Sequence, residues 1–166
     1  MIYSFRFLLH QEKDFIAEID APDDSTFFDF HLSIQKFLKY DNRQMASFII
    51  TDKTWNKLKE IAMVNFEQEN GESPMKTFKL SEILTKKGQR MLYVFDFFSE
   101  RAFFVQLINI REGKIKTCKL KNMTGQIPDQ TKIDLDFPDA DNFDEEDDDF
   151  NNLDDFDDLQ FDSDNF

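Results

Sequence analysis

The stretch that most constrains the fold is residues 90–110, RMLYVFDFFSERAFFVQLINI, the most apolar part of the chain. Apolar side chains alternate along it on either side of a polar turn made by Ser99, Glu100 and Arg101. A period of two is typical of β-strands, and a short polar turn between two such runs is typical of a hairpin. Because each strand has apolar residues on both faces, the pattern predicts a central hairpin whose sheet is covered on both sides.

Further strands and one main helix are predicted around this hairpin. Residues 2–9 and 15–19 predict an antiparallel pair, and residues 46–51 and 114–120 predict two more strands, the second at a sheet edge because it is rich in lysine. Residues 27–38 predict an amphipathic helix with Ser25 as its N-cap. The face toward the sheet should hold Phe27, Phe30, His31, Ile34, Phe37 and Leu38. Residues 52–76 have no regular pattern, and residues 80–84 predict a short helix ended by Gly88.

Charge divides the chain into two parts. All 20 Lys and Arg lie at or before Lys132, whereas residues 134–166 hold 16 of the 34 acidic residues. The formal charge is therefore +2 over residues 1–133 and −16 over residues 134–166. We expect a folded α+β head at residues 1–128, mostly antiparallel sheet with one main helix packed on it. Residues 129–166 should form an acidic, Phe-containing tail that self-repulsion keeps disordered.

The tail also carries regularly spaced aromatic residues. Six phenylalanines recur every five to seven residues between residues 137 and 166. One interpretation is a docking segment for a protein partner with a basic surface, with carboxylates guiding the approach and phenyl rings making the contact. Its candidate contact residues are Phe150, Phe156, Phe161, Asp164 and Phe166. The alternatives are a solvated appendage that only aids solubility, and mimicry of nucleic acid.

Three residues of the head form a possible polar site: His31, Asp96 and Arg101. His31 lies on the apolar face of the predicted helix, where a hydrogen-bonded core histidine is the alternative to a catalytic base. Asp96 is the lone charge in its strand, so it should accept hydrogen bonds from the following turn or pair with Arg101 or His31. No nucleophile and base can be paired from the sequence, so no residue is assigned as catalytic.

The single cysteine, Cys118, excludes a disulfide within the chain and favours a cytosolic protein in which this side chain is a half-buried hydrophobe. With only two histidines beside it, a zinc site is not expected, and no other metal or cofactor is predicted. No apolar run approaches the ~18 residues of a membrane span, so no membrane association is expected.

The head resembles the plasmid pRiA4b ORF-3-like family, whose members are carried on plasmids and mobile elements. The likeness rests on Phe30-His31 and Ile34-Gln35 in the helix, on the run from Tyr93 to Phe103, and on a segment with Cys118, Gly125 and Pro128. In the family, the hairpin motif has the form Tyr-x-Tyr-Asp-Phe-Gly-Asp-x-Trp-x-His. The resemblance covers roughly residues 1–128 and implies a compact α+β fold.

This chain departs from the family motif at four positions. The Gly, second Asp, Trp and His are replaced by Phe98, Ser99, Arg101 and Phe103. A polar site formed by that motif is therefore not intact here, and the family has no settled activity to transfer. The sequence favours a non-enzymatic interaction protein linked to mobile-element or nucleic-acid biology. The alternatives are an enzyme, or a head that binds DNA and is masked by its own acidic tail.

Overall fold

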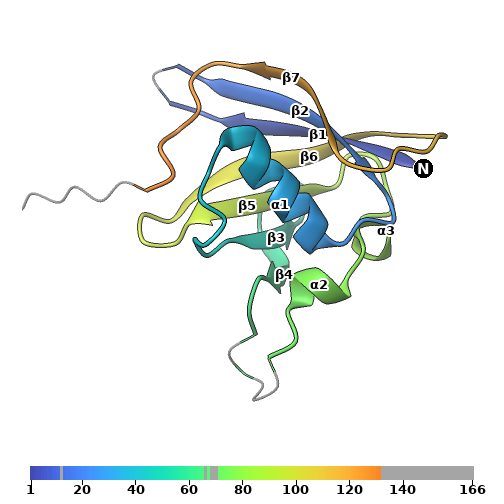
Figure 1. Cartoon of the computed structure of the whole chain (residues 1–166), viewed down its shortest axis with the longest axis horizontal. Helices are drawn as coiled ribbons and strands as arrows, with labels where there is room; N and C mark the ends of the chain where they lie inside the picture. The colour runs from blue at the N-terminus through green and yellow to red at the C-terminus, as the bar shows by residue number, and fades with distance from the viewer. Residues whose placement is uncertain (12, 66, 68–70, 132–166) are drawn as a thin grey trace, which may run out of the picture. The chain divides into compact units, whose positions relative to one another are not determined.

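One antiparallel sheet organises the residues that the computed structural model describes, which are 1–11, 13–65, 67 and 71–131. Within them, seven strands are ordered β4-β3-β5-β6-β1-β2-β7 (Figure 1). Residues Met1–Lys132 form one compact unit. The strands are β1 (Ile2–Leu9), β2 (Phe15–Pro22), β3 (Ser47–Thr51), β4 (Lys57–Ala62), β5 (Arg90–Asp96), β6 (Arg101–Arg111) and β7 (Lys119–Thr124). The prediction of a mostly antiparallel sheet is confirmed.

The predicted central hairpin is the pair β5 and β6, which occupies the third and fourth places in the sheet. On its inner face, Tyr93 lies opposite Phe103 and both are fully buried. The prediction that both faces are covered is wrong. On the outer face Leu92 and Val94 are only half-buried, and Phe104 is 36% exposed. Alternation of apolar residues on both faces therefore does not mean that both are buried in this protein.

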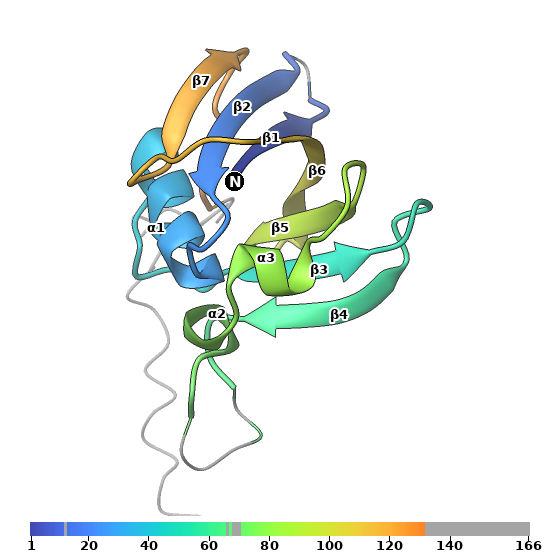
Figure 2. The ribbon, with the colours of Figure 1, turned by 90° about the vertical axis from the view of Figure 1, so that its right-hand side faces the viewer.

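The main helix, α1 (Phe27–Leu38), lies across the inner face of the sheet, as Figures 1 and 2 show. Phe30 anchors it, because its ring centroid is 4.7 Å from that of Phe5 and 5.7 Å from that of Phe48. The N-cap is Thr26 rather than the predicted Ser25. The Thr26 hydroxyl accepts from the Asp29 amide at 3.1 Å, and the Asp29 carboxylate accepts from the Thr26 amide at 3.2 Å. This reciprocal pair satisfies two amide donors at the helix start.

Residues 52–76, expected to be irregular, contain strand β4 and most of the short helix α2 (Pro74–Thr77). Only one residue of β4, Ile61, is fully buried, so this edge strand has no alternating pattern to reveal it. The next short helix, α3 (Leu80–Ile83), ends before Gly88, which adopts φ +92° in the following loop. The strand predicted at residues 114–120 is wrong for most of its length, because residues 114–118 are not a strand. The edge strand is β7 (Lys119–Thr124), which shares two residues with the prediction.

The tail predicted for residues 129–166 lies outside the described residues, apart from positions 129–131. Among the helices that the structure describes, none has the length and apolar character needed to cross a bilayer.

Candidate functional site

Asp96 and Arg101 meet at the turn that joins β5 to β6. The Arg101 Nε and Nη2 atoms donate to Asp96 Oδ2 at 3.0 and 2.9 Å. Asp96 Oδ1 accepts from the Ser99 amide at 3.2 Å. Of the contacts that the sequence suggested for Asp96, those with the following turn and with Arg101 are present. Arg101 also donates to the Asp129 carbonyl oxygen at 2.7 Å, and this hydrogen bond links residue 129 to the hairpin.

His31 belongs to a second polar group, which is buried between α1 and the sheet. Its Nδ1 lies 2.8 Å from Tyr93 Oη, and Gln35 Nε2 donates to the same oxygen at 2.5 Å. Because Gln35 donates to this oxygen, the Tyr93 hydroxyl can donate to His31 Nδ1. The other ring nitrogen, Nε2, is buried and has no hydrogen-bond partner among the described residues. Burial lowers the pKa of His31 to about 4, so the ring is neutral at pH 7.

Asp129 and Gln130, near the end of the described chain, each contact one of these two polar groups. Asp129 contacts Arg101, and Gln130 Nε2 donates to Gln35 Oε1 at 3.2 Å and to the Asp41 carbonyl oxygen at 2.8 Å. The structure thus brings Asp96 and Arg101 together and places His31 with Tyr93 and Gln35. The sequence did not assign Tyr93 or Gln130 to a polar site, because their partners are far away along the chain.

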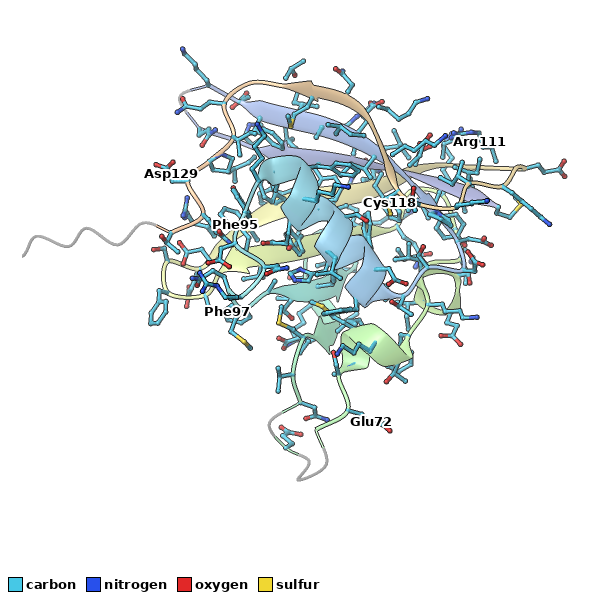
Figure 3. All side chains as sticks on the ribbon, viewed as in Figure 1. Glu72, Phe95, Phe97, Arg111, Cys118 and Asp129 are labelled. Carbon is cyan, nitrogen blue, oxygen red and sulfur yellow. The ribbon has the colours of Figure 1, made fainter. Side chains whose placement is uncertain are left out.

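An apolar hollow of about 310 Å³ lies beside the Asp96 turn. Phe95 and Phe97, labelled in Figure 3, belong to its wall, and Phe98 at its edge is 96% exposed. The complete lining is Gln44, Met45, Phe95, Asp96, Phe97, Phe98 and Thr131. Such a hollow can accept an apolar side chain, but it presents one buried carboxylate already engaged by Arg101.

A different hollow, of about 530 Å³, is lined by cations and is called the basic pocket below. Its lining is Lys53, Lys86, Lys87, Gly88, Gln89, Arg90 and Gln106, with no carboxylate. None of its four cations forms an ion pair with another residue of the described part of the chain. Sequence reasoning missed this pocket, and the adjacent lysines at 86 and 87 were the only local signal.

Two hydrogen-bonded turns hold the basic pocket in place. In the first, Gln89 Oε1 accepts from the amides of Thr85 and Lys86 at 2.6 and 2.7 Å. The Gly88 amide of the same loop donates to the Leu107 carbonyl oxygen in β6 at 2.7 Å. The exposed lysines therefore project from a loop that is fixed to the sheet.

The second turn joins β3 to β4 and carries Lys53. The Asp52 carboxylate accepts from the Asn56 and Thr54 amides at 3.0 and 2.8 Å, and these bonds, with one from the Thr54 hydroxyl, lower the pKa of Asp52 to about 2. Arg90 donates to the Lys53 carbonyl oxygen and places its guanidinium carbon 5.0 Å from the centroid of the Trp55 ring. Arg90 thus joins the two turns, and Trp55 stands at the border of the pocket.

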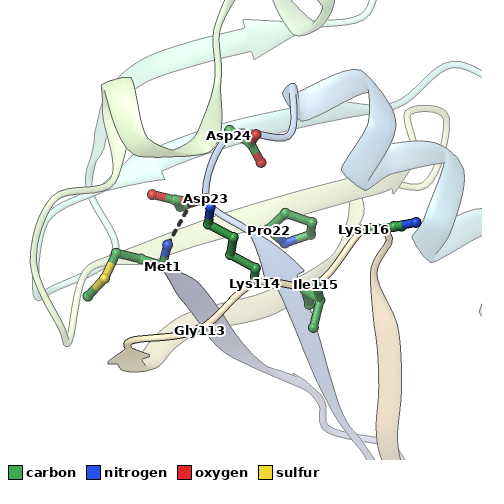
Figure 4. Close-up of a pocket in the computed structure, with 8 residues that line it drawn as sticks. All are labelled: Met1, Pro22, Asp23, Asp24, Gly113, Lys114, Ile115 and Lys116. Atoms are coloured by element: carbon green, nitrogen blue, oxygen red, sulfur yellow. Dashed lines mark hydrogen bonds and ion pairs between the residues drawn. The ribbon is translucent and has the colours of Figure 1, made fainter.

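A third hollow, at the amino terminus, differs from the basic pocket because carboxylates are part of its lining (Figure 4). Lys114 and Lys116 line it together with Asp23 and Asp24, and the Met1 amino group lies 3.1 Å from Asp23 Oδ1. Two carboxylates therefore stand among the cations of that hollow. Of these three hollows, the basic pocket is the one lined by cations without a carboxylate, and it is the best suited to an anion.

The remaining predicted site residues, Phe150, Phe156, Phe161, Asp164 and Phe166, lie outside the described residues. Within the described part of the chain, no group of three or more His, Cys, Asp or Glu side chains is placed to hold a metal ion.

Comparisons with known proteins identify the family. The family model described as plasmid pRiA4b ORF-3-like protein matches residues 1–165, a longer span than the residues that carry the motifs. No curated protein sequence matches the chain. A similar solved structure is a protein of unknown function, MM3350, from Methanosarcina mazei Go1, with 22% identity, a TM-score of 0.56, and coverage of 74% of this chain and 68% of that one. That likeness concerns the fold alone. The chain belongs to the plasmid pRiA4b ORF-3-like family.

Proposed function

We propose that this protein is a non-enzymatic, cytosolic interaction protein of nucleic-acid or mobile-element biology, and that its head binds an anionic polymer at the basic pocket. The observation that carries the proposal is the gathering of Lys53, Lys86, Lys87 and Arg90 around one hollow without a carboxylate in its lining. Cations that form no ion pair within the described head are available to phosphate groups, and the counterions that such contacts release favour binding.

The alternative of an enzyme has less support from the head. His31, the best candidate for a base, is fully buried and neutral, and its ring faces Tyr93 rather than a hollow. Asp96 is engaged by Arg101. General acid–base catalysis requires a titratable group within reach of a substrate, and neither residue meets that requirement in this geometry.

Replacing Lys53, Lys86 and Lys87 together by glutamine should weaken binding of an oligonucleotide. Because three cations are then missing from the phosphate site, we expect affinity to fall about tenfold or more, and the slope of log K against log salt to become shallower by about 2. Fluorescence anisotropy of a labelled single-stranded oligonucleotide, titrated at several salt concentrations, measures both quantities.

The matched control replaces three other lysines, Lys114, Lys116 and Lys119, by glutamine. It removes the same charge from another part of the head, so net charge alone would weaken binding equally in both variants. Equal losses of affinity and slope in the two triple variants would contradict a role for the basic pocket.

A second candidate function is docking of the tail on the basic surface of a partner protein. It is favoured by the 16 acidic residues of residues 134–166 and by the regular phenylalanines among them. Carboxylates would steer the encounter, and phenyl rings would supply the buried contact. The same protein can have both functions. The strongly negative tail would then also reduce the affinity of the head for nucleic acid.

A further inference from the structure

The outer face of the sheet carries a partly exposed apolar band, on the side opposite to α1. Its members are neighbours in the register of five adjacent strands. Ile49 pairs with Leu92, Leu92 with Phe104, Phe104 with Leu8, and Leu8 with Ile16. Phe104 and Ile16 are each 36% exposed, and the other three are half-buried. We call these five residues the apolar band.

The basic pocket opens on the same face as the apolar band. Arg90 precedes Leu92 by two positions in β5, and Gln106 follows Phe104 by two positions in β6, so strand alternation puts each pair on one face. Arg90 and Gln106 are also opposite each other in the register. The cations therefore stand at one end of a partly exposed apolar surface.

Trp55 joins the two features. Its ring centroid is 4.8 Å from that of Phe104 with the planes at 82°, and the Arg90 guanidinium carbon lies 5.0 Å from the Trp55 ring centroid. The Trp55 backbone has φ +65°, a left-handed conformation that costs energy for a residue with a side chain. Two aromatic rings and a planar guanidinium are thus gathered beside the basic pocket.

We propose that this face binds single-stranded nucleic acid, with phosphates in the basic pocket and unpaired bases on Trp55, Phe104 and the apolar band. The inference rests on the proposed function and adds the form of the polymer and the residues that contact its bases. Aromatic side chains on a sheet beside a basic groove recognise unstacked bases, whose faces a duplex keeps hidden. A duplex would contact only the cations of the basic pocket, through its phosphates.

The test uses the intrinsic fluorescence of Trp55, which is the only tryptophan of the chain. The full-length protein and residues 1–132 are each titrated at low salt with single-stranded oligothymidine, a duplex of equal length, inorganic polyphosphate, and phosphatidylglycerol vesicles. We expect oligothymidine to quench Trp55 by half or more and to bind at least tenfold more tightly than the duplex.

The outcomes separate this inference from the proposed function. Equal affinity for all polyanions, measured by their competition with a labelled oligothymidine, together with unchanged Trp55 fluorescence would overturn the base contacts and leave the basic pocket as a general anion site. Quenching by vesicles alone would replace nucleic acid with a membrane surface. Failure of every polyanion to bind either protein would overturn both proposals.

Two substitutions of Trp55 complete the test, with affinity measured by anisotropy of a labelled oligothymidine. Trp55→Gly suits the positive φ and should preserve the turn, yet it should lower affinity about tenfold because a stacking surface is removed. Trp55→Phe keeps an aromatic ring and should retain most of the affinity. Unchanged binding by Trp55→Gly, with circular dichroism showing an intact fold, would overturn the assignment.

Discussion

Deleting residues 134–166 should produce two opposite changes in binding. Capture of a basic protein partner should fall to background, because the acidic and aromatic groups of the tail are gone. The affinity of the remaining chain for nucleic acid should rise on the order of a hundredfold at low salt, because its formal charge changes from −14 to +2. Pull-down from a cell lysate measures the first change, and fluorescence anisotropy with a labelled oligonucleotide measures the second.

A variant of the full-length chain separates the two effects. Serine replaces Phe150, Phe156, Phe161 and Phe166, and every carboxylate is kept. Partner capture should disappear because the rings are missing, whereas affinity for nucleic acid should stay low because the charge is unchanged. If both the deletion and the serine variant capture the same proteins as the natural chain, tail docking is wrong.

The head should remain folded after the deletion. Residues Met1–Lys132 form one compact unit, and all seven described strands and the buried core belong to it. A cooperative thermal transition followed by circular dichroism is therefore expected for the shortened chain, and it is the prerequisite for interpreting its binding.

The central hairpin and α1 could be predicted because their patterns are local. Each strand of the hairpin repeats an inward residue every second position, and Phe27, Phe30 and Ile34 repeat at helical spacing. The contacts of Asp96 were predictable for the same reason, since Ser99 and Arg101 follow within five residues. Strand β4 was missed because five of its six residues are not fully buried, so hydrophobicity gives no period there.

The outer face of the sheet shows why an apolar pattern alone is ambiguous. Leu92 and Phe104 look as apolar in the sequence as their inward neighbours, but α1 covers only one side of the sheet. Whether an apolar residue is buried depends on which elements pack on it, and that is decided by the topology. An exposed apolar surface also has a different meaning from a core, since it marks a place where a partner can bind.

The basic pocket could not be predicted because its cations come from separate turns. Lys53 belongs to the β3–β4 turn, whereas Lys86 and Lys87 belong to the loop after α3. They meet only because β3 pairs with β5, which brings residue 51 opposite residue 90. The link between His31 and Tyr93 spans 62 residues and depends on the packing of α1 in the same way.

Acidification from pH 7 to pH 5 should lower the free energy of unfolding by about 2 kcal/mol through His31 alone. Burial holds the pKa of His31 at about 4 in the folded protein, against an ordinary value of 6.5. Between these values the unfolded chain binds the proton and the folded chain does not, so stability falls as the pH drops below 6.5. The destabilisation is complete below pH 4, where it reaches roughly 3 kcal/mol. Urea denaturation at half-unit pH steps measures the curve.

The matched variant is His31→Asn, whose side-chain oxygen can stand near the position of Nδ1 and accept from the Tyr93 hydroxyl. The asparagine side chain does not titrate, so the part of the pH dependence due to His31 should disappear. All other titratable groups are the same in both proteins, so the difference between the two curves isolates His31. Parallel curves from pH 7 to pH 5 would mean that His31 can be protonated within the folded head. In that case the ring is not enclosed, and the case against a catalytic role for His31 loses its main support.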